Sequence, residues 1–173
     1  MRRLILLAML IAAVPAAAQP RRQTAPTQPA PAQSIWGRDT VALTAAFDRV
    51  MMRLRYTTRM DAVLCDITTT LACTVEVRGI ELRITGQVTP EEVREVRVPF
   101  TRSTRFPDVA MLTHALLEIA EPSAPEAERR SAVLRLLGVD SPRADRIVVG
   151  RTEVRFVDGF REKAFQFRML PDR

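Results

Sequence analysis

The chain has 173 residues, with 26 Lys and Arg against 20 Asp and Glu, and a formal net charge of +6. All but one of the basic residues are Arg, Asn is absent, and aromatic residues make up 5% of the chain. Because Arg and Glu alternate along its segments and stacking aromatics are scarce, the composition argues against a nucleic-acid-binding protein.

The first 18 residues are expected to form a Sec signal peptide that is cleaved after Ala18. Arg2 and Arg3 make a positive start, residues 4–14 are an apolar run, and residues 16–18 are small, as signal peptidase requires. The run is short for a hydrocarbon core of about 30 Å. We therefore expect a periplasmic or secreted protein with no integral membrane span after cleavage, and retention of the segment as an anchor is the alternative.

Residues 19–34 are expected to be a disordered tether, because Pro alternates there with Ala, Gln and Thr and such a composition buries little apolar surface. Residues 35–173 then form one domain, a length sufficient for a hydrophobic core. Four arginines lie in the signal and the tether. The domain itself therefore has a net charge close to neutral, and most of the chain's net positive charge lies outside it.

A helix is expected to open the domain, over residues 39–56. Leu43, Phe47, Val50 and Leu54 recur at a spacing that places them on one helical face. Asp39 or Thr40 can cap its first turn.

Two strands joined by a short turn are expected next. Apolar residues occupy the odd positions of residues 63–77, and the even positions of the second run are mainly polar, which is the alternation of a half-buried strand. If residues 68–70 form the turn, Cys65 lies directly opposite Cys73.

The alternation continues in two further strands, over residues 80–85 and 95–100. Arg78 and Gly79 suit a two-residue hairpin turn. Residues 89–92 have the spacing of a helical capping box, so one helical turn is expected there. Pro99 cannot donate to a strand ladder, which predicts that the fourth strand is an edge strand or ends at that point.

Two helices are expected over residues 108–120 and 123–138. Ser123 and Glu126 have capping-box spacing, and Gly138 is a suitable C-cap. Asp158–Gly159 then predicts a hairpin between two C-terminal strands, with a bulge at Gly150 where the alternation slips. The fold class is therefore α+β: an N-terminal helix, a four-strand antiparallel meander, two helices and a C-terminal β-hairpin, with the helices on one face of the sheet.

Cys65 and Cys73 are the only two cysteines. Their spacing lacks the close ligand pairs of a zinc site and the two-residue spacing of a redox pair. An exported chain meets an oxidising compartment, and the expected register brings the two Cα atoms to roughly 4.5–5.5 Å. We predict a structural disulfide, with two separate buried thiols as the alternative.

No motif in the chain indicates catalysis, a cofactor or a metal site. The Gly-x-Ser-x-Gly elbow and the Gly-rich phosphate loops are missing, and the sole histidine, His114, has no nucleophile nearby in the sequence. We therefore name no catalytic residue, no cofactor and no metal ligand.

The loop over residues 100–108 is the most suggestive binding segment. Arg102, Ser103 and Arg105 could together grip a carboxylate or phosphate group, and the alternative is an exposed connection. Our first expectation is a non-catalytic binding or adaptor protein whose envelope protein partner uses a sheet face or a strand edge. A second is a binder of anionic envelope polymers or ligands through this loop and the basic tether, and a third is an enzyme of unrecognised type.

Overall fold

The computed structural model describes residues 34–171 except 62, 140–141 and 161. The expected signal peptide and nearly all of the expected tether lie outside the described residues. The described part is α+β, with three helices and a sheet of seven strands. In chain order its elements are α1 (Thr40–Arg53), β1 (Leu64–Ile67), β2 (Leu71–Val77), β3 (Ile80–Gln87), β4 (Glu92–Phe100), α2 (Phe106–Ala120), α3 (Glu126–Leu137), β5 (Arg146–Val149), β6 (Thr152–Asp158) and β7 (Lys163–Met169).

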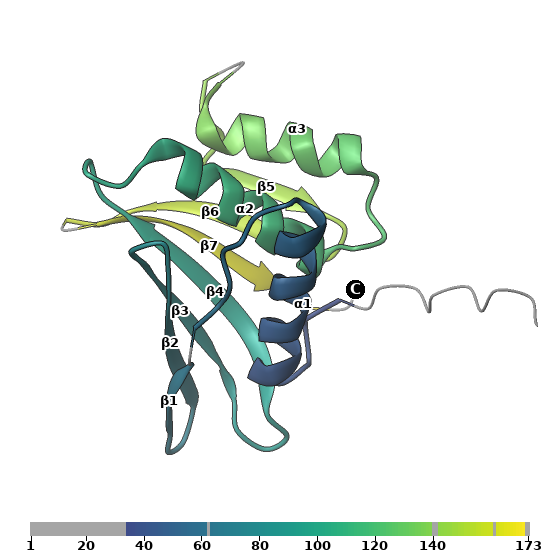
Figure 1. Ribbon diagram of the computed structural model, residues 1–173, viewed down its shortest axis with the longest axis vertical. Helices are drawn as coiled ribbons and strands as arrows, with labels where there is room; N and C mark the ends of the chain where they lie inside the picture. Colours follow the sequence, from purple (N-terminus) through teal and green to yellow (C-terminus); the bar gives the residue numbers. More distant parts are fainter. Residues whose placement is uncertain (1–33, 62, 140–141, 161, 172–173) are drawn as a thin grey trace, which may run out of the picture. The chain divides into compact units, whose positions relative to one another are not determined.

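The sheet is antiparallel throughout and its strand order is β1-β2-β3-β4-β7-β6-β5 (Figure 1). It therefore consists of two meanders. The first four strands form one, the last three form the other, and the pairing of β4 with β7 joins them.

The hydrophobic core lies between the helices and one face of the sheet (Figure 1). Leu43 and Phe47 of α1 are fully buried against this face, because their helical spacing places them on one side. In β2 and β3 every second side chain is buried, as expected for a sheet covered on one side only. The helix α3 contacts α2 and β5. The other face of the sheet, over the described residues, is not covered by a helix (Figure 1).

The register predicted for the first three strands is confirmed. Cys65 pairs with Cys73 across residues 68–70, and Val77 pairs with Ile80 across the turn at 78–79. Both residues of that turn have positive φ, 53° at Arg78 and 77° at Gly79, which is the twist that closes a two-residue hairpin.

The C-terminal part differs from the prediction, because it holds three strands and the sheet therefore has seven. Gly150 does not form a bulge. With Arg151 it makes the turn between β5 and β6, where Val149 pairs with Thr152. The predicted hairpin at Asp158–Gly159 is present between β6 and β7, closed by a longer loop in which Gly159 N–H donates to the carbonyl of Glu162 at 3.0 Å.

Two local predictions are also wrong, and of the two alternatives predicted for β4 the edge position is wrong. Residues 89–92 form no helical turn, since β4 already begins at Glu92. The capping box at Ser123 is not formed either, because Pro125 is the N-cap of α3. The strand β4 is internal, between β3 and β7. It does end at Phe100, and its pairing with β3 ends at Arg97, before Pro99.

The start of α1 is fixed by two carboxylates. Asp39 accepts a hydrogen bond from Ala42 N–H at 2.7 Å, as an N-cap does. Glu91, from the β3–β4 turn, accepts from the N–H and the hydroxyl of Thr40, at 3.0 and 2.7 Å. The bonds to Glu91, across 51 residues of sequence, thus tie the start of the helix to the sheet. Among the described residues, none of the helices has the length and apolar character needed to cross a membrane.

Candidate functional site

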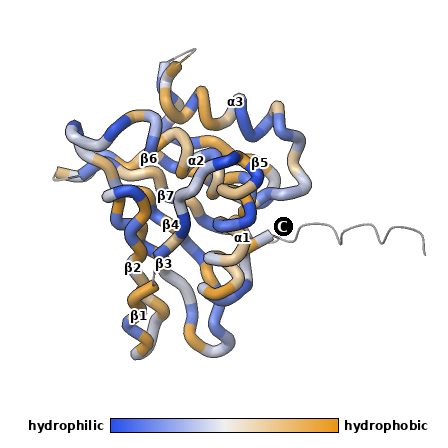
Figure 2. Tube along the Cα trace, viewed as in Figure 1, coloured by the Kyte–Doolittle hydropathy of each residue, from blue (hydrophilic) through white to orange (hydrophobic). Residues whose placement is uncertain are grey.

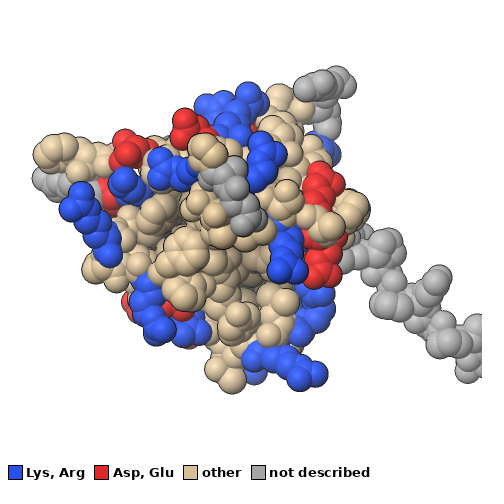
Figure 3. Space-filling model, turned by 90° about the horizontal axis from the view of Figure 1, so that it is seen from above, with Lys and Arg blue, Asp and Glu red and all other residues tan. Residues whose placement is uncertain are grey.

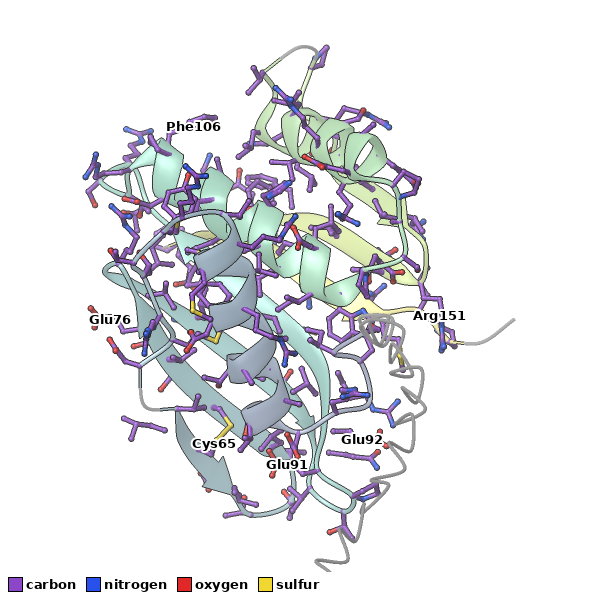
Figure 4. All side chains as sticks on the ribbon, turned by 45° about the vertical axis from the view of Figure 1, so that its right-hand side comes forward. Cys65, Glu76, Glu91, Glu92, Phe106 and Arg151 are labelled. Carbon is purple, nitrogen blue, oxygen red and sulfur yellow. A yellow bond between two sulfur atoms is a disulfide. The ribbon has the colours of Figure 1, made fainter. Side chains whose placement is uncertain are left out.

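A disulfide joins Cys65 of β1 to Cys73 of β2. Cys73 is buried at 2% exposure, whereas Cys65 is exposed beside the first half of α1 (Figure 4). The Cα separation is 4.0 Å, somewhat shorter than the separation expected from the register. The bond fastens the outermost strand to the sheet, which is a structural role.

The predicted binding loop is only partly assembled into a site. Ser103 and Arg105 line a hollow of about 430 Å³ between this loop and the β2–β3 turn, whereas Arg102 is exposed and does not line it. The hydroxyls of Thr101 and Ser103 lie 2.7 Å apart and stabilise the loop itself. A ligand-binding role for Arg102, Ser103 and Arg105 stays a prediction.

The charges around this hollow balance. Its basic residues are Arg78, Arg83 and Arg105, and its acidic residues are Glu81, Asp108 and Glu162. Arg78 Nε lies 2.8 Å from Asp108 Oδ1, and Arg83 pairs with both oxygens of Glu162 at 2.6 and 3.1 Å. With its cations already paired, the hollow has little excess charge to offer an anion.

A second surface, which the sequence did not reveal, lies on the open face of the sheet. The strand registers align two rows of outward side chains across β3, β4, β7, β6 and β5. The first row is Arg83, Arg97, Gln166, Arg155 and Arg146, and the second is Thr85, Glu95, Arg168, Glu153 and Val148. We call these two rows the arginine rows. The rows hold five arginines and two carboxylates, and one of the five, Arg83, is also paired with Glu162 outside the rows. The rows still carry an excess of positive charge.

Glu153 organises the centre of the arginine rows. Its side chain is fully buried although it lies on the face without helices, because the side chains of Arg146, Arg155 and Arg168 enclose it. Arg155 Nε lies 2.7 Å from Glu153 Oε2, and ion pairs also join Glu153 to Arg146 and Arg168. The three guanidinium side chains keep between 38% and 56% of their surface exposed. One buried anion therefore positions three accessible cations.

The ionisation of Glu153 follows from this arrangement. Burial raises the pKa of its carboxyl, but the hydrogen bonds from Arg155 and Arg168 and the charges of Arg168 and Arg146 outweigh burial, so the pKa lies below its ordinary value. Glu153 is consequently ionised at neutral pH and keeps the three arginines together.

Arg97 completes the surface. It lies opposite Arg83 on one side and Gln166 on the other. Its Nε is buried and has no hydrogen-bond partner among the described residues. A buried donor without a partner is costly. Since this atom is inaccessible, a ligand would contact Arg97 through the exposed part of the half-buried residue.

The other titratable groups assemble no metal site. Among the described residues, no group of three His, Cys, Asp or Glu side chains could hold a metal ion. His114 lies on α2, and burial lowers the pKa of its imidazole. The Glu118 carboxylate opposes this shift, and the Arg129 guanidinium adds to it. His114 is neutral at pH 7.

Charges elsewhere are mixed. Viewed from above, basic side chains lie in small groups next to acidic ones, without forming one continuous basic surface (Figure 3).

Comparison of the chain with protein family models, curated proteins and solved structures finds no match. The open face therefore has to be interpreted from its own chemistry.

Proposed function

We propose that the chain is an exported, non-catalytic binding domain that holds an extended anionic polymer across the arginine rows. The observation that carries the proposal is the cluster of Arg146, Arg155 and Arg168 around the buried Glu153. Guanidinium groups recognise carboxylate and phosphate groups through paired N–H donors. Here they are held in place before a ligand arrives, which lowers the entropic cost of binding.

The geometry of the rows favours an extended ligand over a small one. Neighbouring strands lie about 4.8 Å apart, so a row that crosses five strands extends over roughly 19 Å. Arginines occupy four of the five positions in the first row. A linear polymer with regularly spaced anionic groups can contact several of them at once, whereas a single anion would use only one part of the surface.

The proposed location is the periplasm or the cell exterior, after removal of the signal peptide. The disulfide between Cys65 and Cys73 supports it, because such bonds persist in oxidising compartments. The Pro-rich tether would then be a semi-rigid segment that precedes the domain in the mature protein. The envelope protein partner expected from the sequence would need a surface other than the arginine rows.

Calorimetry at several salt concentrations tests the proposal. It measures the binding of the purified exported protein to dextran sulfate and to polyglutamate, with neutral dextran as the reference. We expect both polyanions to bind, with affinity falling as salt rises. The double variant Arg97→Gln and Arg146→Gln should bind about tenfold more weakly, since each exposed ion pair contributes up to about 1 kcal/mol.

The matched control is Arg49→Gln with Arg130→Gln, which removes the same charge from exposed positions on α1 and α3. It should bind as the unmodified protein does. Equal weakening in both double variants would show that only net charge matters and would overturn the proposal. Binding to vesicles that contain phosphatidylglycerol, without binding to either polymer, would also overturn it in favour of a lipid surface.

A further inference from the structure

The edge strand β1 has apolar side chains that none of the described elements covers. All four of its residues are exposed, with Leu64 at 72% and Ile67 at 55%. Figure 2 shows this apolar character along β1 at the margin of the sheet. Long apolar side chains on an open strand edge are unusual, because such edges promote pairing with other chains. This edge is therefore a candidate for pairing with another chain.

The main chain of β1 is oriented to accept another strand. In an antiparallel pair, residues with closely spaced Cα atoms exchange no hydrogen bonds with each other, and their N–H and C=O groups point away from the partner strand. The 4.0 Å Cα separation of Cys65 and Cys73 identifies such a pair. Since the pattern alternates, Cys65 and Ile67 direct their N–H and C=O groups to the open edge. The disulfide holds this edge in register.

A groove runs beside this edge. It has a volume of about 630 Å³ and lies between α1 and the segment that leads into β1. Its lining is mainly apolar or small and is formed by Thr40, Val41, Thr44, Ala45, Asp48, Met60, Asp61, Val63 and Cys65. Val41 is 75% exposed. Side chains of an added strand that point to the helical side of the sheet would enter this groove.

The charge of the groove selects its occupant. Asp48 and Asp61 line it, and no basic residue does, although the chain as a whole is Arg-rich. Asp66 adds a carboxylate on the opposite face of β1, since its side chain alternates with that of Cys65, which lines the groove. A second copy of the chain is a poor match, because its β1 would bring another Asp66 and no basic residue. A cationic segment with alternating apolar side chains fits both the groove and the acids.

We propose that β1 and the adjacent groove form a second binding site, separate from the arginine rows, which takes up an extended cationic peptide segment of another protein as an additional antiparallel or parallel strand. Main-chain hydrogen bonds to Cys65 and Ile67 supply the pairing. Apolar side chains of the peptide occupy the groove beside Val41 and Val63. Lysine or arginine side chains of the peptide point to the other face and meet Asp66 there. Asp48 and Asp61 in the groove disfavour anionic side chains in the peptide.

A defined probe tests this site. It is a short capped peptide in which lysine and valine alternate, titrated into the purified exported protein and followed by NMR. Amide hydrogen exchange at Cys65 and Ile67 should slow on binding, whereas exchange at the opposite edge strand β5 should not change. A peptide with glutamate in place of lysine, and one with N-methylated main-chain amides, should each bind at least tenfold more weakly.

Two matched variants distinguish this edge from the other. Ile67→Lys places a positive charge beside the groove, and Val148→Lys makes the same change at a 45% exposed position of β5. The first should abolish binding of the lysine peptide and the second should leave it unchanged, with circular dichroism confirming that both variants are folded. The proposal is overturned if the N-methylated peptide binds equally well, if Val148→Lys causes the loss, or if the free protein dimerises through β1.

Discussion

Gly150 lies so close to the side chain of Glu121 that a Cβ atom at position 150 would stand 2.2 Å from Oε2 of that carboxylate. Gly150 also has a φ of 54°, a region that costs other residues about 1 kcal/mol or more. Glu121 is 8% exposed, and its Oε1 accepts hydrogen bonds from Arg151 N–H at 2.9 Å and from the Thr152 hydroxyl at 2.7 Å. It therefore cannot move aside without losing those bonds.

We predict from this contact that Gly150→Ala lowers the free energy of unfolding by about 2–4 kcal/mol, from the positive φ and the displaced carboxylate together. Chemical denaturation followed by circular dichroism measures it. Gly79→Ala is the control, because Gly79 has a φ of 77° with nothing within 4 Å of the added Cβ. Equal losses in the two variants would mean that Glu121 does not contribute.

A second prediction concerns Thr152, which links Glu121 to the single tryptophan. Trp36 Nε1 donates to Thr152 Oγ1 at 2.7 Å, and the same hydroxyl donates to Glu121. Thr152→Val removes the partner of the Trp36 indole N–H and one of the two hydrogen bonds to Glu121 Oε1, which should cost about 1–3 kcal/mol. Because Trp36 is the only tryptophan, its fluorescence reports the change directly. Thr152→Ser keeps the hydroxyl and should preserve the emission of the unmodified protein.

Reduction of the disulfide should loosen β1 with little effect on the rest of the sheet. The bond closes a short loop, between residues 8 apart in the sequence, so its loss should cost about 2 kcal/mol. Hydrogen exchange should accelerate at residues 64–67, and the mass should rise by two hydrogens. Maleimide labelling of the unreduced exported protein would contradict the bond.

The low pKa of Glu153 predicts a dependence of stability on pH. A carboxyl whose pKa is lower in the folded state contributes stability that is complete above its unfolded value, 4.5, and is lost as the pH falls through the folded value. Glu153→Gln should be less stable than the unmodified protein at pH 7 by about 1–3 kcal/mol. The difference should shrink below pH 4.5.

Urea denaturation of both proteins between pH 7 and pH 3 measures this difference. Glu162→Gln is the comparison, because Glu162 also pairs with an arginine but lies 30% exposed and should contribute less. A constant difference across the pH range would show that Glu153 is not stabilised as a carboxylate by its three arginines.

The N-terminal meander could be predicted in detail because its information is local. Strict alternation in β2 and β3, the turn at Arg78–Gly79 and the opposed cysteines all depend on residues that are neighbours in the sequence. One register choice satisfied them all, and a shift by one residue would have exposed the whole apolar set.

The errors arise where distant residues decide the local structure. The segment at 89–92 has the spacing of a helix start, but Glu91 binds Thr40, 51 residues away. At Gly150 the sequence suggested a bulge within one strand. In the structure Gly150 lies in a turn between two strands, where it closely approaches Glu121. Neither partner can be identified from the neighbouring sequence.

The arginine rows could not be predicted from the sequence for the same reason. Each arginine stood at an outward position of its own strand, and the alternation with Glu suggested a solvated surface. Only the pairing of β4 with β7 brings Arg97 next to Gln166 and, across β7, into line with Arg155 of β6. The loop at Arg102 and Arg105 was prominent because its residues are contiguous, yet the charges around it are balanced.

The junction between β4 and β7 has a consequence for how the chain reaches its folded form. Within each meander the strands pair with neighbours in the chain, whereas the closest pair across the junction, Phe100 and Lys163, is 63 residues apart. Pairings between distant residues form slowly, since a long loop must close first. We therefore expect the two meanders to assemble early and independently, and the docking of β7 onto β4 to limit the folding rate. A chain cut between α2 and α3 would yield two fragments, each with a complete meander, whose reassociation would report that docking step by itself.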